Sequence, residues 1–303
     1  MRIAVGSVPG GHAQLWLIEE ARAISIPEVA RLAGNERMAA CADIAEFLAL
    51  NGIETLRTWQ SAGLLADAPF FPLAALHLHA PISARSKIMC SAFNYHAHGV
   101  ETKIKLPSEP YLFLKPTSSL NGPEDVIVKP GVSSRMDYEC ELAVMIGRPA
   151  KNIEARDALS YVAGYFVAND VSFRDFQYNV GHEDLLQSLG QNWLLGKGLD
   201  TALPAGPWLT TVDESGHGPF RLECQVNGET VQQASTDEMI FDVATLIAHA
   251  SRGMTLQPGD VISTGTPAGV AQGGSRRYLE AGDRVTCEIA GLGALHNRVV
   301  DEA

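Results

Sequence analysis

Acidic residues at alternating positions of one segment, MDYECELAVMIG (136–147), are the first candidates for chemistry. In a β-strand, this segment would point Asp137, Glu139 and Glu141 to one face and the residues between them to the other. Apolar residues follow as far as Ile146, so the strand should enter a core, where a bare carboxylate costs several kcal/mol. A divalent cation would compensate the negative charge.

Two of these acids can reach the same ion, because Glu139 and Glu141 are two residues apart. Asp170 ends the apolar run GYFVAND further along the chain and could complete the site. Oxygen ligands alone favour Mg²⁺ or Mn²⁺, with Ca²⁺ as a further option, over Zn²⁺. Three protein ligands would leave coordination positions open, as a catalytic ion requires. The alternative is that both Glu side chains lie on a solvated strand face, where most Glu residues are found.

A possible acid–base pair lies in FNYHAHGVE (93–101), where a short helix would place His98 and Glu101 on one face. Such a pair suits a general base with an orienting carboxylate. His96 is a competing base that the spacing does not exclude. A surface His near a Glu without any function is the ordinary alternative.

Two further segments could bind an anion. Lys197 follows apolar residues in NWLLGKGLD, so its ammonium could be partly desolvated and held over an anionic substrate. The loop STGTPAGV (263–270) offers Thr264 and Thr266, whose hydroxyl and backbone N–H groups could bind a carboxylate. An ordinary turn explains this loop equally well.

The elements that must position these residues fall into two regions. Residues 1–75 contain a strand-like start, MRIAVG, and two segments with helical spacing, and they predict a small N-terminal α/β domain. The stretch 68–83, rich in Pro and His, is interpreted as a linker. From 84 to 303 strands follow one another too closely for a regular βαβ series. The sequence therefore predicts a β-rich α+β fold.

Turn and capping signals punctuate the second region. Asn227-Gly228 divides an alternating segment and predicts a β-hairpin. Ser235 and Glu238 form a capping-box pattern that predicts the start of a helix.

Composition limits the class of partner and the compartment. Of 303 residues, 46% are hydrophobic, the net charge is −12, and no Lys/Arg cluster is present, which argues against nucleic acid and anionic membranes as partners. The five cysteines form no CxxC pair and are expected to be free thiols of a cytoplasmic protein. No signal peptide and no apolar stretch of membrane-spanning length is expected.

Taken together, seven segments resemble the fumarylacetoacetate hydrolase family. They occur in the family's order and cover about residues 90 to 300: FNYHAHGVE, FLKPTSSLNGP, MDYECELAVMIG, GYFVANDVSFRDFQ, GKGLDTALPAGPWLTT, VNGETVQQASTDEMIF and LQPGDVISTGTPAGV. The resemblance is to the branch of acylpyruvases and 2-hydroxyhepta-2,4-diene-1,7-dioate isomerases. It implies a mixed β-roll or sandwich fold, an Mg²⁺ or Mn²⁺ site and a homodimer.

The resemblance also implies a role for individual residues. It makes Glu139, Glu141 and Asp170 the metal ligands, and His98 and Glu101 a catalytic dyad on a lid. The remaining implied residues contact the substrate: the active-site lysine Lys197, the polar contacts Arg174 and Gln177, and Thr266, which grips a carboxylate. Arg174 could instead be a structural partner of Asp175.

The expected activity is metal-dependent hydrolysis of a C–C bond in a 2,4-dioxo, acylpyruvate-type carboxylic acid. His98 would activate the water, and the ion and Lys197 would stabilise the enolate that leaves. Isomerisation, decarboxylation or hydration of a related 2-oxo or 2-hydroxy-dienoic acid is the alternative within enzymes. A non-catalytic member that binds a metabolite is the alternative outside them.

Overall fold

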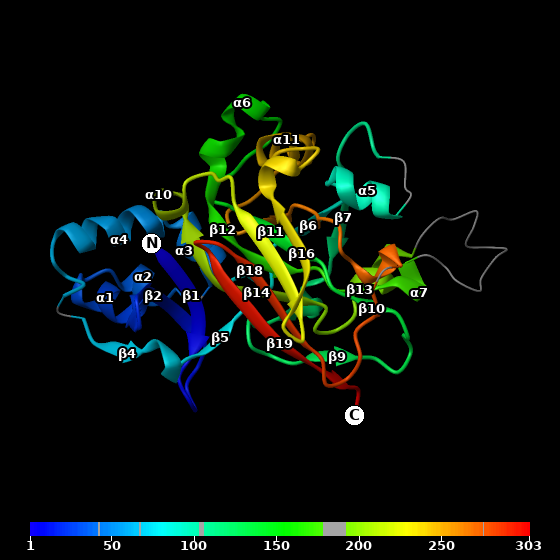
Figure 1. Ribbon diagram of the computed structural model, residues 1–303. Coiled ribbons are helices and arrows are strands. Elements are labelled where there is room, and N and C mark those ends of the chain that lie inside the picture. The colour runs from blue at the N-terminus through cyan, green and yellow to red at the C-terminus, as the bar shows by residue number, and fades with distance from the viewer. Residues whose placement is uncertain (42, 67, 103–105, 178–191, 275) are drawn as a thin grey trace.

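Strands dominate the computed structural model, which describes residues 1–41, 43–66, 68–102, 106–177, 192–274 and 276–303. Within these residues the strands form a twelve-stranded sheet, a five-stranded sheet and a two-stranded ribbon (Figure 1). This confirms a strand-rich, mixed α/β protein with several sheets. No helix in the described part of the chain combines the length and the apolar character needed to cross a membrane.

The twelve-stranded sheet has the order β4-β3-β2-β1-β14-β12-β11-β17-β6-β7, with β5 paired to β1 and β8 to β14. Its strands are β1 (Arg2–Ser7), β2 (Gln14–Glu19), β3 (Arg22–Ser25), β4 (Phe70–Pro72), β5 (His77–His79), β6 (Ile88–Ala92), β7 (Tyr111–Lys115), β8 (Leu120–Asn121), β11 (Cys140–Ile146), β12 (Val162–Asn169), β14 (Leu203–Thr211) and β17 (Val261–Ser263). Most neighbours are antiparallel, but β17 runs parallel to β6.

The five-stranded sheet has the order β16-β15-β18-β19-β9, and β10 pairs with β13 in the ribbon. These strands are β9 (Ile127–Lys129), β10 (Met136–Asp137), β13 (Ser172–Phe173), β15 (Arg221–Val226), β16 (Glu229–Ser235), β18 (Arg284–Ile289) and β19 (Gly293–Asp301). The hairpin predicted at Asn227-Gly228 is confirmed: both residues have positive φ and connect β15 to β16.

Helices are short. They are α1 (Ile26–Leu32), α2 (Glu36–Ala39), α3 (Ile44–Ala49), α4 (Gly52–Ser61), α5 (His96–Thr102), α6 (Ala155–Ala158), α7 (Arg174–Gln177), α9 (Trp193–Lys197), α10 (Val212–Ser215) and α11 (Val243–Ala250), with 3₁₀ turns η1 (Leu73–Ala75), η2 (Thr117–Ser119), η3 (Leu159–Tyr161), η4 (Thr236–Glu238) and η5 (Ala271–Gly273). The capping box of Ser235 and Glu238 is present, but it opens only η4. The longer helix, α11, begins after its own N-cap, Asp242.

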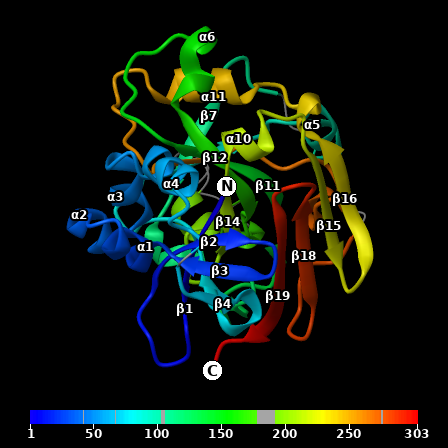
Figure 2. The same cartoon turned by 90° about the vertical axis from the view of Figure 1, so that its left-hand side faces the viewer.

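The central strand β11 is buried on both faces, which explains its continuous apolar run. Leu142 and Val144 belong to a core shared with the five-stranded sheet. Ala143 and Met145 belong to a second core, which includes side chains of helices α1 to α4. Figure 2 shows these helices on one side and the β15–β16 hairpin and β18 on the other.

The N-terminal region shares the large sheet with the rest of the chain, because β1 pairs with β14 through Arg2 and Thr210. The division into domains 1–75 and 84–303 therefore remains a prediction. The interpretation of 68–83 as a linker is wrong in one respect: β4 and β5 lie in it, and they pair with β3 and β1. Aromatic residues such as Phe70 and Phe71 favour a strand here, although the Pro residues of the same stretch are typical of a loop.

Candidate active site

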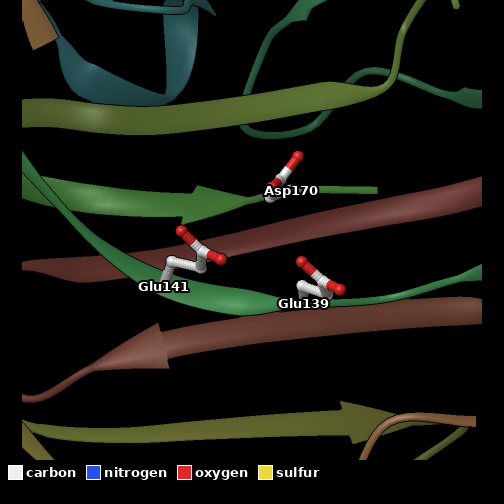
Figure 3. Close-up of side chains that lie close together, drawn as sticks. All are labelled: Glu139, Glu141 and Asp170. Carbon is white, nitrogen blue, oxygen red and sulfur yellow. The ribbon is translucent and has the colours of Figure 1, made fainter. Parts of the chain in front are cut away.

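The acid trio converges because of strand register. Antiparallel pairing places Cys140 opposite Asn169, so the residues just beyond this pair, Glu139 and Asp170, also face each other. The backbone N–H of Asp170 donates to the carbonyl of Glu139 at 2.9 Å. Glu141, two residues along, points to the same side (Figure 3).

All three carboxylates are buried, and one oxygen from each lies within 4.8 Å of the other two. The predicted strand over 136–147 is interrupted between β10 and β11, at Tyr138 and Glu139. The side-chain amide of Asn169 accepts the N–H of Glu139 there, at 2.9 Å, in place of a ladder bond. This break leaves Glu139 in the trio but directs Asp137 elsewhere.

Two lysines neutralise part of the trio. Lys197 Nζ donates to Glu139 Oε2 at 2.5 Å and to Asp170 Oδ2 at 2.7 Å. Lys115 Nζ donates to Asp170 Oδ1 at 2.6 Å. Lys115 was not singled out from the sequence. It ends an exposed-edge strand, and only the tertiary fold brings it to Asp170.

Arg174 completes the ion pairs. It is 1% exposed and contacts Glu139 Oε1 at 2.6 Å and Asp137 Oδ2 at 2.9 Å. Its guanidinium also donates to Gln177 Oε1 at 2.7 Å. Asp175 is not its structural partner, because that carboxylate accepts from residues 133 and 134. The predicted substrate contacts of Arg174 and Gln177 remain predictions.

The electrostatics of the two Glu residues differ. Burial opposes ionisation of Glu139, but the charges of Lys197 and Arg174 outweigh it and lower its pKa to about 2. Burial and the charges of Asp170 and Glu139 raise the pKa of Glu141 well above 4.5. Within the described residues Glu141 forms no ion pair; it accepts from Ser263 and from the N–H of Gly265.

This donor set fits a divalent cation. The described buried cluster holds four acids, the trio and Asp137, against three cations, Lys115, Arg174 and Lys197. One negative charge is therefore uncompensated, and it falls on Glu141. Carboxylate oxygens alone suit Mg²⁺, Mn²⁺ or Ca²⁺, and the identity of the metal remains a prediction.

The structure separates the two candidate histidines. His98 is buried and lines the same cavity as the trio, whereas His96 is exposed. Nδ1 of His98 lies 3.7 Å from Glu101 Oε2, as the i to i+3 spacing on α5 predicts. That distance is longer than a hydrogen bond, and Nδ1 has no hydrogen-bond partner among the described residues. The Glu101 carboxylate instead accepts from the N–H of Gly269.

Thr266 also reaches the cavity, but its hydroxyl is already bonded. It donates to the carbonyl of Cys140 at 3.1 Å and accepts from Gln232 at 2.9 Å. Gln232 comes from the second sheet and was missed, because nothing in its local sequence indicates that contact.

The cavity itself is small, with a volume of about 20 Å³, which is room for one water molecule. Three aromatic side chains narrow it: Phe93, Phe113 and Trp193. An organic acid therefore requires the lining to move. Trp193 was noted from the sequence only as an apolar neighbour of Lys197. Phe93 and Phe113 were missed, since a buried aromatic is ordinarily part of a core.

Comparisons with known proteins show the family to which the chain belongs. A family model described as "Fumarylacetoacetate (FAA) hydrolase C-terminal" matches residues 87–300. The human protein "Oxaloacetate tautomerase FAHD2A, mitochondrial" is 44% identical over 242 residues, which are 78% of this chain and 74% of that protein. The cytoplasmic location expected here remains a prediction.

Two solved structures are similar over the whole chain. One is 2-hydroxyhepta-2,4-diene-1,7-dioate isomerase from Mycobacterium marinum, with a TM-score of 0.72 and 32% identity, covering 100% of this chain and 99% of that one. The other is maleylpyruvate hydrolase from Sphingobium sp. SYK-6, with a TM-score of 0.78 and 31% identity, covering 100% of both. The resemblance read from the seven segments is thus confirmed, and this protein belongs to the fumarylacetoacetate hydrolase family.

Proposed function

We propose that the protein is a divalent-metal-dependent tautomerase of a short 2-oxo diacid of the oxaloacetate type. The observation that carries the proposal is a buried imidazole, that of His98, which lines the same cavity as the acid trio. Keto–enol exchange needs only one group that moves a proton between a carbon and an oxygen. The name of the human relative supports oxaloacetate as the substrate class.

A divalent ion held by Glu139, Glu141 and Asp170 would supply Lewis-acid polarisation of a 2-oxo acid. His98 would take the proton from carbon 3 as the electron pair of that C–H bond forms the C2–C3 double bond. The former carbonyl oxygen gains the electron pair of its π bond, and His98 returns the proton to it. Glu101 faces Nδ1 of His98, so Nε2 is the nitrogen available to the substrate.

Cations balance the negative charge that develops on the substrate oxygen. Lys197 and Arg174 line the cavity, and both are fixed by buried carboxylates. Cations that are already held in place stabilise a developing anion, because their side chains need not reorganise during the reaction. Aromatic side chains around the cavity would exclude water, which favours proton return over side reactions.

Hydrolysis of a C–C bond in an acylpyruvate-type acid, expected from the sequence, is the second candidate. The likeness to maleylpyruvate hydrolase over the full chain favours it. The same His98 would then deprotonate a water rather than carbon 3. Isomerisation of a dienoic acid has comparable support from the Mycobacterium marinum isomerase. Decarboxylation, hydration and metabolite binding without turnover remain alternatives from sequence reasoning.

The test follows the ultraviolet absorbance of the oxaloacetate enol as it decays to the keto form. The metal-stripped protein, the protein with Mn²⁺ and Mn²⁺ alone are compared, since free metal ions can also catalyse the reaction. Acceleration only by protein with metal supports the proposal. A panel of acylpyruvates is run in parallel with product analysis. Two acid products from the panel, without acceleration of oxaloacetate ketonisation, would make the protein a hydrolase instead.

A further inference from the structure

Asp137 is the one acid of the opening segment that the trio does not use. It is fully buried, and its carboxylate accepts four hydrogen bonds. Oδ1 accepts from the N–H groups of Tyr138 and Ala271, at 2.9 and 2.8 Å. Oδ2 accepts from the N–H of Gln272 at 3.0 Å and from Arg174 Nε at 2.9 Å. Two of the four donors therefore belong to the backbone of the loop around η5.

The same loop holds Glu101. The N–H of Gly269 donates to both carboxylate oxygens, at 3.1 and 3.0 Å. A Cβ added to Gly273 would lie 2.4 Å from Cδ of Glu101, so the Glu101 side chain packs directly on bare backbone. We call residues 269–273 the Glu101 seat.

The segment beside the trio supports this seat at a second point. The Tyr138 hydroxyl donates to the carbonyl of Gly269 at 3.0 Å. Asp137 and Tyr138 thus bind the seat, while the next residue, Glu139, belongs to the trio. The consecutive residues 137–139 therefore connect the Glu101 seat with the acid trio.

We propose that Asp137 is a positioning residue, which fixes the Glu101 seat and, through Glu101, the place of His98 relative to the metal ligands. The inference rests on the proposed roles of His98 and Glu101. The competing explanation is that Asp137 only balances Arg174, which binds Glu139. In that case Asp137 would affect catalysis through Arg174 and the metal ligand Glu139, and not through Glu101.

A double-mutant cycle separates the two explanations. Asp137→Asn keeps the size of the side chain but weakens acceptance from the seat, and kcat for oxaloacetate ketonisation should fall about 10- to 100-fold, with a much smaller change in KM. In the Glu101→Ala background, Asp137→Asn should lower kcat much less, because the Glu101 seat then has no carboxylate to bind. An equal loss in both backgrounds would assign Asp137 to the Arg174 route and overturn the proposal.

Amide hydrogen exchange of the Mn²⁺-loaded protein gives a readout without turnover. Asp137→Asn should speed exchange in residues 96–102 and 269–273 but not in β12. Asp260→Asn is the matched control: Asp260 is also buried, accepts two backbone N–H groups and pairs with a cation, Lys87. It should leave exchange in 96–102 unchanged.

Unchanged exchange at 96–102 in Asp137→Asn would overturn the inference whether or not the enzyme turns over oxaloacetate. If the wild type fails to accelerate ketonisation, only the proposed function fails. If Asp137→Asn does not fold, Tyr138→Phe is used, because it removes only the bond to the Gly269 carbonyl. That variant should raise exchange in 269–273, and no change there would contradict the proposal.

Discussion

Charge at individual residues controls this site. Glu139 and Asp170 are each paired with cations, but Glu141 accepts only from neutral donors among the described residues. A bound cation would therefore compensate mainly the charge of Glu141. Removal of the Glu141 carboxylate is the direct test of the acid trio.

Glu141→Gln should abolish Mn²⁺-dependent activity and reduce the metal content of the purified protein, because it removes the uncompensated charge. Gln can still accept from Ser263, so the fold should survive. Metal analysis and the oxaloacetate assay on the same preparation check both effects. Full activity in a metal-free preparation would contradict the metal assignment.

The pH dependence of stability tests the same residue. Because burial and neighbouring carboxylates raise the pKa of Glu141 above 4.5, the metal-free folded state keeps a proton that the unfolded chain has lost. The contribution of Glu141 to stability is thus present at low pH and lost as pH rises above about 4.5 through the folded pKa. In metal-free buffer, Tm of Glu141→Gln should rise relative to wild type between about pH 5 and pH 8. Saturating Mn²⁺ should reverse the order, and a pH-independent difference in Tm would contradict this account.

His98→Ala should lower turnover by about 10² to 10⁴-fold, the usual contribution of a general base, without changing Mn²⁺ affinity. His96→Ala is the matched control, since this neighbour is exposed, and it should have little effect. Steady-state kinetics and a metal titration on both variants decide the matter. Damage from His96→Ala alone would assign the base to the other histidine.

Lys197→Met should weaken binding of oxalate, an enolate mimic, and lower turnover, because it removes a cation from the cavity. It also leaves Glu139 and Asp170 short of a partner, so the metal-free protein should lose about 3–5 kcal/mol of stability. Mn²⁺ affinity should hold or rise. Paired titrations of Mn²⁺ and oxalate test this, and unchanged oxalate affinity would show that Lys197 does not contact the anion.

At the scale of elements, the sequence predicted local features and missed those created by pairing between distant segments. The period-2 alternation of 136–147 predicted that Glu139 and Glu141 lie on one side, and the structure places them together there. It did not predict the break at Tyr138, because the bond that replaces the ladder comes from Asn169 on another strand. Lys115 and Gln232 were missed for the same reason: their partners lie 55 and 34 residues away.

Close packing of β12 on β14 gives a prediction at this scale. A Cβ added to Gly164 would lie 2.2 Å from the carbonyl oxygen of Thr210, so the strands must separate or shift. Gly164→Ala should cost at least about 1–3 kcal/mol and disturb the sheet that carries Asp170. Gly131→Ala is the control, because the nearest atom would be 3.7 Å away. Thermal unfolding of both variants measures the difference, and equal Tm values would contradict the claim.

At the scale of the whole molecule, we propose that the protein is a homodimer. Support comes from apolar side chains exposed on the edge strand β7 and on α9, Tyr111, Leu114 and Leu194 among them. Exposed apolar groups of this kind are typical of association surfaces. Light scattering should give twice the 32.5 kDa chain mass, and Leu114→Glu should lower it. A wild-type mass of one chain would contradict the proposal.

The pairing of distant strands also has a consequence for biosynthesis. Strand β1 pairs with β14, β6 lies parallel to β17, and β9 pairs with β19 at the last strand of the chain. The twelve-stranded sheet is complete only after β17 (Val261–Ser263) has been synthesised, and the five-stranded sheet only after β19 (Gly293–Asp301). During translation strands such as β2 and β3 can pair with each other at once, but the edges of β1, β6 and β9 that pair with later strands lack partners. These long-range pairings slow folding and leave unpaired edges open to aggregation. Nascent chains of this protein are expected to depend on chaperones until β17 and β19 have been synthesised.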